Sequence, residues 1–408
     1  MKKLNVVILA ILAVTFAQAG QVEWQTTTSL PRASWRHACA AANGFLYFLG
    51  GGNGPEASCY YARIGPDGML GDWQPTTDLP VAMGWFTAEA TSSHIYVCGG
   101  WNMSGLSSAV YYAPLDTSGA IGEWTATTPL PVPLYTQGGI LIDSCIYVVG
   151  GALSISGPVV ADVRYARIQP DGALGDWTAT SSLPMALRIM GVVAHDTFVY
   201  SIGGRGNDGR AKDVTYFARI NTDGSLEQWD PTSSLDRAID GLTCAVMGEW
   251  AYAIGGDGLS TDYSAECRGG LSTWVDQTPL PAIRWASDGL AVNDIVYVPG
   301  GYDGNPQATV YLGQYVLGVR ERPAGRPTET GFQLAASVLR RPAELRFSLS
   351  GKQPLRLSIV DASGRTRETM VLEPGEHVLA LPSLEPGTYF ARLRTGTGFG
   401  CERFEVLE

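Results

Sequence analysis

The stretch Phe45-Leu46-Tyr47-Phe48-Leu49-Gly50-Gly51 is an apolar run that ends in two glycines, and its ending recurs along the sequence. Gly-Gly stands at 50–51, 99–100, 150–151, 203–204, 255–256 and 300–301. The successive spacings are 49, 51, 53, 52 and 45 residues. A period of this length indicates a repeat architecture in which each repeat is one supersecondary unit.

A second marker keeps step with the glycine pair. Tryptophan stands at 24, 73, 124, 177, 229 and 274, with the same five spacings. A Thr/Ser-rich step and then Leu-Pro follow each tryptophan, except that the fifth copy has Leu235-Asp236. Chance does not keep two markers in step over this distance. The sequence therefore contains six units.

Each unit is predicted to form four strands. In the first unit we expect them at residues 37–42, 45–50, 58–64 and 70–76. Asn43-Gly44 is a hairpin-turn signal, and Pro66-Asp67-Gly68 predicts the third connection, because glycine accepts positive φ. Four-stranded units with a period near 50 are typical of propeller blades. The repeated Gly-Gly…Tyr…Trp pattern resembles the kelch repeat, which implies a six-bladed kelch-type β-propeller over residues 20–318.

The ends of the repeat region predict how the ring closes. No tryptophan strand follows the sixth Gly-Gly unit after residues 311–317, whereas residues 22–28 at the start form an orphan tryptophan strand. Placing the N-terminal strand outermost in the last blade pairs both ends and removes two unpaired edges. We therefore expect the N-terminal strand to close the last blade.

Composition supports the all-β fold class. The 408 residues include 50 glycines, 11 tryptophans and 18 tyrosines, and only 16% are charged. A disordered protein is rich in charge and poor in aromatic residues, and collagen has glycine at every third position, so both classes are excluded. Short strands joined by tight turns account for this composition.

The N-terminus predicts export. Lys2 and Lys3 precede an apolar run at residues 4–16, and Ala17-Gln18-Ala19 supplies small residues for cleavage. This is the pattern of a secretory signal peptide over residues 1–19. No later segment holds eighteen uninterrupted apolar residues, so we expect no membrane span in the mature protein.

A second domain follows the repeats. Residues 319–331 are a Pro/Gly-rich linker, and residues 332–408 predict several short alternating strands typical of a small Ig-like sandwich. The series at 357–365 and 384–393 resembles the C-terminal sorting domain of type IX secretion substrates. That resemblance implies type IX machinery as a partner and a location outside a Gram-negative cell or on its outer surface. The acidic end at 404–408 departs from the family, whose signals often end in lysine, and a plain Ig-like accessory domain remains open.

Charge restricts the partners. Residues 20–318 carry 13 Lys and Arg against 28 Asp and Glu, without a basic run. Such a body repels phosphate backbones and anionic membranes, so nucleic acid is not expected as a partner. A glycan or a surface protein is the expected partner class.

Candidate ligand-binding residues come from aligning the units on the leucine of Leu-Pro. The loops after each Gly-Gly and the Leu-Pro loops should share one face, which we call the top face, around the mouth of a central channel. The candidates on this face are Trp35, Arg36, Trp85, Tyr135, Arg188, Asp240, Arg284 and Trp285. Aromatic planes beside charged groups suit a sugar, and the arginines suit an acidic one. The same aromatics could instead pack against one another and plug the channel.

The sequence predicts no cofactor, no metal ligand set and no catalytic residue of recognisable spacing. Two pairs of the seven cysteines, Cys39 with Cys59 and Cys244 with Cys267, would join strands two apart. Such strands are separated by about 9.6 Å, beyond the roughly 7 Å limit for a disulfide, so we predict that neither bridge forms.

Three functions remain open at this point. The first is non-catalytic recognition of a glycan or a surface protein through the top face. The second is a metal-free sugar epimerase, since this sequence resembles the sialate epimerases (mutarotases) in blade count and export. Acid–base candidates for it are Asp240, Asp288, Glu89 and Arg188. The third is a structural component of the cell surface.

Overall fold

The computed structural model describes residues 21–316 continuously and a set of strands between Gln333 and Leu407. The protein divides into two compact units, one of which covers Gln21–Leu317. None of the described residues forms a helix, and accordingly none belongs to a helix that could cross a membrane. The predicted signal peptide (1–19) and linker (319–331) lie outside the described residues.

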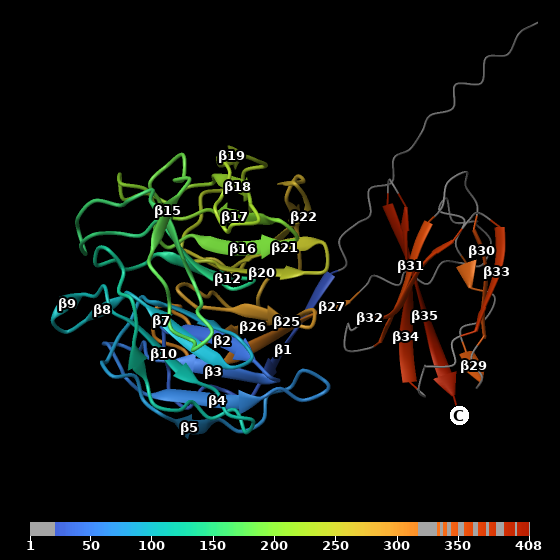
Figure 1. The fold of residues 1–408 in the computed structure, drawn as a ribbon, viewed down its shortest axis with the longest axis horizontal. Helices are drawn as coiled ribbons and strands as arrows, with labels where there is room; N and C mark the ends of the chain where they lie inside the picture. Colours follow the sequence, from blue (N-terminus) through green and yellow to red (C-terminus); the bar gives the residue numbers. More distant parts are fainter. Residues whose placement is uncertain are drawn as a thin grey trace, which may run out of the picture. The chain divides into compact units, whose positions relative to one another are not determined.

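Gln21–Leu317 forms six sheets arranged as blades (Figure 1), and the prediction of an all-β, six-bladed propeller is confirmed. Blade 1 comprises β2 (Ala38–Ala42), β3 (Phe45–Leu49), β4 (Cys59–Arg63) and β5 (Gln74–Thr76). Blade 2 comprises β6 (Thr87–Ala90), β7 (His94–Cys98), β10 (Val110–Pro114) and β11 (Thr125–Ala126). Blade 3 comprises β12 (Gly138–Ile142), β13 (Cys145–Val149), β14 (Val163–Arg167) and β15 (Thr178–Thr180).

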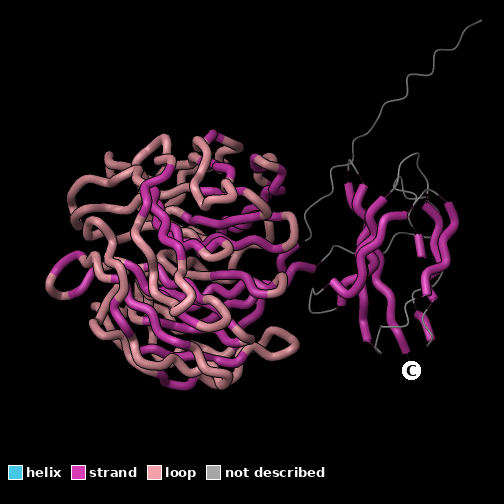
Figure 2. The backbone as a smooth tube through the Cα atoms, in the orientation of Figure 1, coloured by secondary structure: helices cyan, strands magenta, loops and turns pink. Residues whose placement is uncertain are grey.

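The other three blades repeat this order, from an innermost to an outermost strand. Blade 4 comprises β16 (Gly191–His195), β17 (Phe198–Ile202), β18 (Thr215–Arg219) and β19 (Asp230–Pro231). Blade 5 comprises β20 (Thr243–Met247), β21 (Trp250–Ile254), β22 (Asp262–Arg268), β23 (Gly270–Leu271) and β24 (Val275–Asp276). Blade 6 comprises β25 (Leu290–Val292), β26 (Ile295–Pro299), β27 (Val310–Val316) and β1 (Gln21–Thr27). A separate hairpin, β8 (Trp101–Asn102) and β9 (Gly105–Leu106), projects from the body of the propeller (Figure 2).

The N-terminal strand closes the ring. β1 pairs antiparallel with β27, from Gln21 opposite Val316 to Thr27 opposite Val310. The Trp24 indole N–H donates to the Thr278 carbonyl at 2.9 Å, across the seam between blades 5 and 6. The other five repeat tryptophans donate to the preceding blade in the same way, to Thr28, Thr77, Thr128, Ser181 and Ser233. The tryptophan repeat is therefore a hydrogen bond that recurs at every seam.

The repeat tyrosines join blades in the other direction. All six lie on the second strand of a blade and are buried. Four donate their hydroxyl to a glycine carbonyl in a turn of the next blade, namely Tyr96 to Gly172, Tyr147 to Gly224, Tyr200 to Gly269 and Tyr297 to Gly68, at 2.6–3.3 Å. Burying each ring also removes a large apolar surface from water.

The glycine pairs allow the blades to approach closely. The second glycine of each pair donates its N–H to a carbonyl of the next blade at 2.7–2.9 Å. Gly150 shows why the first glycine has no side chain: its φ is +57°, and a Cβ there would lie 2.4 Å from the Leu187 carbonyl oxygen. Both the positive φ and the contact with the neighbouring backbone exclude other residues.

The described cysteines are thiols. Cys39 and Cys59 lie on β2 and β4, with β3 between them, and Cys244 and Cys267 lie on β20 and β22 in the same relation. Burial raises the pKa of Cys59 to about 12, so this thiol stays protonated. These side chains serve as small apolar packing groups.

The C-terminal strands form two sheets. One contains β28 (Gln333–Leu334), β30 (Glu344–Leu349) and β33 (Gly375–Ala380). The other, in the order β29-β35-β34-β31-β32, contains β29 (Val338–Arg340), β35 (Gly398–Leu407), β34 (Gly387–Thr395), β31 (Leu355–Asp361) and β32 (Thr366–Leu372). β29 is parallel to β35, and the other pairs are antiparallel. The Ig-like assignment of residues 332–408 stays a prediction.

We expect Gly150→Ala to destabilise the propeller by about 3 kcal/mol or more. The left-handed backbone alone costs alanine about 1–2 kcal/mol, and displacing the Leu187 carbonyl adds to this. Urea unfolding followed by tryptophan fluorescence measures the loss.

Gly209→Ala is the matched control, because Gly209 has φ +73° but no atom within 4 Å of the place that a Cβ would take. Gly209→Ala should lose only the stability that a left-handed backbone conformation costs an alanine. Equal losses in the two variants would contradict a role for Gly150 in the approach of blades 3 and 4.

Candidate functional site

A closed ring of backbone hydrogen bonds surrounds the mouth of the central channel. Each blade contributes the residue just before its innermost strand region, and all six have φ between +51° and +63°. Each N–H donates to the carbonyl of the corresponding residue in the preceding blade. The bonds are Arg36 to Ala286 (3.2 Å), Trp85 to Arg36 (2.8 Å), Thr136 to Trp85 (3.1 Å), Ile189 to Thr136 (2.8 Å), Gly241 to Ile189 (2.9 Å) and Ala286 to Gly241 (2.9 Å). We call these six residues the mouth ring.

The mouth ring holds backbone strain. Thr136 and Ile189 are β-branched and have φ of +57° and +53°, where such residues are outliers. Conformations of this kind cost of order 1–3 kcal/mol each and persist only where the surrounding structure over-determines them. Each strained residue here is fixed by two ring hydrogen bonds. The ring is therefore a rigid platform for the side chains beside it.

Below the mouth ring lies a cavity of about 610 Å³, lined by the innermost strands of all six blades. Small or slender side chains surround it, at Cys39, Ala88, Gly139, Val192, Cys244 and Gly289. Its volume is within the range of cavities that hold a small molecule.

Two carboxyl groups line this cavity. Burial, together with the charge of Asp288, raises the pKa of Glu89, on β6, to about 8. Burial also raises the pKa of Asp288 to about 7, although the Cys39 backbone N–H, 2.8 Å from its Oδ2, favours the charged form. Both carboxyls therefore hold a proton more readily at neutral pH than an exposed carboxyl does.

One side of the mouth is aromatic. The Trp35 ring centroid lies 6.0 Å from that of Trp85, 5.5 Å from Trp285 and 4.6 Å from Tyr302. Trp35 is only 8% exposed. The Arg36 guanidinium lies 3.4 Å from the Trp35 ring centroid and 5.4 Å from that of Trp85. The rings thus pack mainly against one another and against Arg36.

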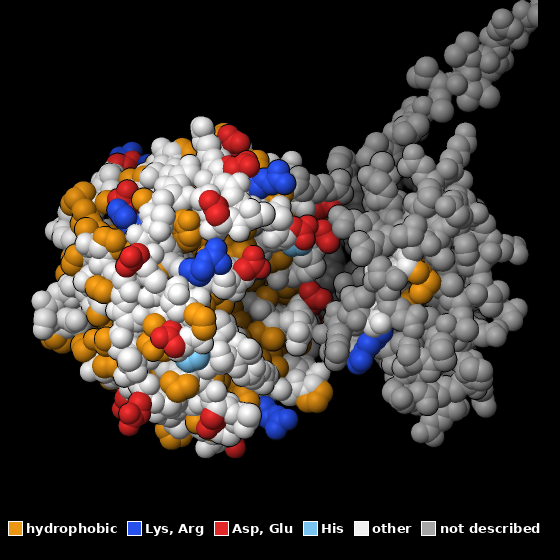
Figure 3. Space-filling model, in the orientation of Figure 1, with side chains coloured by type: hydrophobic (Ala, Val, Ile, Leu, Met, Phe, Trp, Pro, Cys, Tyr) orange, Lys and Arg blue, Asp and Glu red, His pale blue; other side chains and the backbone are white. Residues whose placement is uncertain are grey.

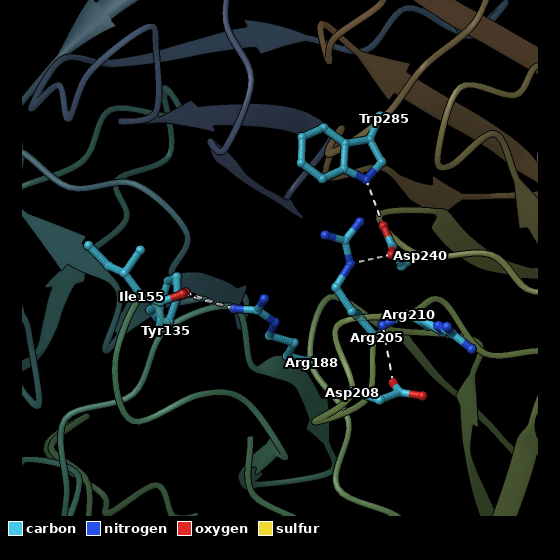
Figure 4. A network of polar contacts seen from close by, with 8 residues as sticks. All are labelled: Tyr135, Ile155, Arg188, Arg205, Asp208, Arg210, Asp240 and Trp285. Carbon is cyan, nitrogen blue, oxygen red and sulfur yellow. Dashed lines mark hydrogen bonds and ion pairs between the residues drawn. The ribbon is translucent and has the colours of Figure 1, made fainter. Parts of the chain in front are cut away.

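The other side of the mouth is polar (Figure 4). The Arg205 Nε–H donates to Asp240 Oδ2 at 2.6 Å, and the Trp285 indole N–H donates to Asp240 Oδ1 at 2.9 Å. Arg188 donates from Nη1 to the Tyr135 hydroxyl at 2.8 Å and to the Ile155 carbonyl at 3.4 Å. Asp240 is fully buried, so its charge is compensated within the protein by Arg205.

Seven of the eight candidate residues therefore come together at the mouth. Arg284 does not join them, because its side chain is 3% exposed and lies between Asp303, at 3.6 Å, and the Tyr311 ring, at 4.8 Å. The sequence alignment missed Arg205 and Tyr302. Both occupy the position after Gly-Gly, which forms a β-bridge to the aligned candidates, Arg188 to Arg205 and Trp285 to Tyr302. Aligning the units on Gly-Gly as well as on Leu-Pro would have shown them.

Among the described residues, no group of three or more His, Cys, Asp or Glu side chains is placed to hold a metal ion. Burial, together with the charge of Arg32, lowers the pKa of His37, next to the mouth ring, to about 3. The His37 ring is therefore neutral at physiological pH.

Several known proteins are similar to this one in sequence. The protein is 26% identical over 189 residues to Kelch-like protein 25 of Xenopus tropicalis, which is 45% of this chain and 31% of that protein. It is 24% identical over 213 residues to Kelch-like protein terF of Aspergillus terreus, covering 49% and 44% of the two chains. Kelch-like protein 23 of Homo sapiens is 24% identical over 187 residues, 44% of this chain and 30% of that protein. No family model matches the chain.

The protein is thus a six-bladed propeller whose similar curated proteins are kelch-like proteins. The matches span less than half the length of the curated relatives. The solved structure of YjhT matches with a TM-score of 0.59 at 13% identity, over 70% of this chain and 95% of that one, and the likeness shows the fold alone.

We expect Glu89→Gln to raise the stability of the propeller above pH 8 and to change it little at pH 4–5. The pKa of Glu89 is raised on folding, so the folded state holds this proton more tightly than the unfolded state. The protonated Glu89 carboxyl makes its full favourable contribution to the free energy of unfolding below the ordinary glutamate pKa. This contribution is lost as the pH rises through about 8. The difference should reach the order of a few kcal/mol in urea unfolding at pH 5 and pH 9.

Glu227→Gln is the control, since Glu227 is exposed in blade 4, away from the cavity. Its stability should follow the wild type at both pH values. A Glu89→Gln profile that is parallel to that of the wild type would contradict the burial of the Glu89 carboxyl.

Proposed function

We propose that the protein is a secreted, non-catalytic recognition protein that binds a glycan or a surface protein through its top face. The top face consists of the loops at 28–37, 50–58, 77–86, 99–109, 127–137, 150–162, 181–190, 203–214, 232–242, 255–261, 277–289 and 300–309. The observation that carries the proposal is the position of exposed apolar side chains. Seven large ones are exposed among the described residues, and six of them, Val81, Met103, Val132, Leu153, Ile155 and Ile283, lie in these loops. A protein face that carries most of the exposed large apolar side chains is typical of a binding surface.

Charge supports the same face. Eight of the thirteen Lys and Arg residues within 21–316 lie in the top-face loops. Only ten of the twenty-eight Asp and Glu residues in the same range lie there. Acidic side chains are scattered over the part of the propeller seen in Figure 3. The top face is therefore the least acidic part of an acidic body, where a ligand with negative groups meets the least repulsion.

Export and attachment complete the proposal. Residues 1–19 act as a signal peptide, and residues 332–408 act as an Ig-like sorting or anchoring domain handled by type IX machinery. The protein then works outside the cell or on the outer surface of a Gram-negative bacterium. Support for this part comes from the N-terminal pattern and from the series at 357–365 and 384–393.

The test uses the full-length protein on a glycan array and on intact bacterial cells, read by fluorescence. Met103→Asp/Ile155→Asp places two charges among the exposed apolar side chains of the top face. We expect this variant to weaken binding at least about tenfold, through lost apolar contact and desolvation of the new charges.

Val275→Asp is the control, because Val275 is 40% exposed but lies on β24, an outermost strand. Its binding should equal that of the wild type. Equal binding by both variants would exclude the top face, and absence of any binding would favour a structural component of the cell surface.

A second candidate, a metal-free sugar epimerase of the sialate type, is favoured by the two cavity carboxyls. General acid–base groups work best with pKa values near the operating pH, and burial raises the pKa of Glu89 to about 8 and that of Asp288 to about 7. Asp240, by contrast, is held by Arg205 and Trp285 and is not free to accept a proton from a substrate.

For this candidate we expect N-acetylneuraminate anomers to interconvert faster with the wild-type protein than in buffer, followed by NMR. Glu89→Gln should lower the catalysed rate by about 100-fold, the usual size of a general acid–base contribution. A wild-type rate equal to that of buffer would eliminate the epimerase.

A further inference from the structure

Two arginines of blade 4 lie side by side at the mouth. The Arg188 N–H donates to the Arg205 carbonyl at 3.0 Å, and the Arg205 N–H donates to the Arg188 carbonyl at 2.7 Å. Residues opposite each other in such a bridge have neighbouring Cβ atoms on one face. The two side chains therefore leave the backbone at neighbouring positions on the rim of the channel. In Figure 4 the Arg188 guanidinium lies toward Tyr135 and Ile155, and the Arg205 guanidinium lies toward Asp240.

The Arg205 guanidinium is held in advance of any ligand. Its Nε–H is bound to Asp240, and Asp240 is bound by the Trp285 indole on its other oxygen. These contacts use only Nε, so the two Nη groups remain for a further acceptor, and 26% of the side chain is exposed. A guanidinium fixed in this way loses little side-chain entropy when it binds a carboxylate.

The Arg188 guanidinium is fixed by neutral groups only. Its Nη1 contacts the Tyr135 hydroxyl and the Ile155 carbonyl. Within the part of the protein that the structure describes, neither Arg188 nor Arg36 has a carboxylate within ion-pair distance. The mouth thus carries three guanidinium groups, and the carboxylates that act on Arg205 are Asp240, by direct contact, and Asp257, by its charge. This excess of positive charge favours a ligand that brings its own carboxylate.

The apolar surroundings decide the kind of molecule that carries this carboxylate. A sugar binds best to an open aromatic face, but the Trp35 ring is 8% exposed and covered by Arg36, Trp285 and Tyr302. The Trp85, Trp285 and Tyr302 side chains are only partly exposed. The exposed apolar groups are instead aliphatic. Next to Arg188, Ile155 is 61% exposed and Leu153 is 39% exposed. Flexible and branched apolar side chains of this kind pack well against other protein side chains.

The hairpin of blade 2 extends the same apolar surface. Met103, at its tip, is 81% exposed. Trp101 and Leu106 of β8 and β9 pack with Tyr135 and Ala152 beneath, so the hairpin and the 152–159 loop share one small apolar cluster. The hairpin that carries Met103 and the loop that carries Leu153 and Ile155 are therefore joined at their bases, and the loop adjoins Arg188 through the Ile155 carbonyl.

We propose that Arg188 and Arg205 bind a carboxylate of an acidic protein segment whose neighbouring apolar side chains pack on Met103, Leu153 and Ile155. The inference rests on the proposed recognition through the top face, and it assigns a polypeptide rather than a glycan as the partner. The carboxylate belongs either to an Asp or Glu side chain or to the C-terminus of the partner, two sources with the same chemistry. Asp240 and Trp285 are positioning residues that hold Arg205.

The experiment uses the full-length protein on an array of twelve-residue peptides in which Glu and Leu or Phe are adjacent. Each peptide is printed with a free and with an amidated C-terminus, and again with Glu replaced by Gln, and uronic-acid and sialylated glycans are printed beside them. The variants are Arg188→Gln, Arg205→Gln and Met103→Ser. Arg219→Gln is the control, because Arg219 is exposed at the end of β18, outside the top-face loops. Thermal unfolding verifies that every variant is folded.

We expect selective binding of the Glu-containing peptides, weakened about tenfold by the Glu to Gln exchange, by Arg188→Gln and by Arg205→Gln, and weakened further by salt. Met103→Ser should weaken binding a few fold, and Arg219→Gln should leave it unchanged. Loss of binding on amidation alone would assign the carboxylate to a C-terminus.

Peptide binding that is unaffected by Arg188→Gln and Arg205→Gln would overturn the inference. Selective binding of acidic glycans instead of peptides would also overturn it, while the proposed recognition through the top face would stand. Failure of the Met103→Asp/Ile155→Asp variant to weaken binding to cells would overturn both.

Discussion

The ring of six backbone hydrogen bonds around the mouth is the constraint on which the upper half of the propeller depends. Each of its residues holds a left-handed backbone, and each bond joins one blade to the next, so the ring closes only if all six blades are present. The ring bonds fix the backbone at each of these residues, so the residue that precedes each one is held beside the mouth. Trp35, Tyr135, Arg188, Asp240 and Trp285 occupy that preceding position, and the ring therefore presents them together.

The seams between blades explain why the repeat markers recur. The glycine pairs allow backbone contact near the axis, and the tryptophan N–H groups bind loops of the preceding blade near the rim. Four of the six repeat tyrosines bind a turn of the next blade through their hydroxyls. Each marker thus acts between blades rather than within one. Because every blade is bonded to neighbours on both sides, the six blades form a rigid frame for the loops of the top face.

The candidate site was partly predictable. The alignment on Leu-Pro found seven residues that meet at the mouth, since equivalent positions of a repeat lie at equivalent places around an axis. Arg284 shares that alignment region but turns away to Asp303 and Tyr311, and no repeat rule decides the direction of a long side chain. Arg205 and Tyr302 were missed because they reach the mouth from another loop of the blade. The pairing of Arg205 with Asp240 and Trp285 depends on distances between blades 4, 5 and 6 that spacing does not encode.

The sequence by itself determined the number of blades, the four-stranded unit and the face on which variable residues gather, because these follow from a period and from local turn chemistry. It also determined the thiol state expected for Cys39 and Cys59, since strand order sets their separation. Only the tertiary structure decided that the aromatic rings cover one another, that Glu89 and Asp288 share a cavity, and that Arg188 and Arg205 stand as neighbours. Those properties arise where side chains from different blades meet around the axis, and the burial and contacts found there depend on the closed ring as a whole.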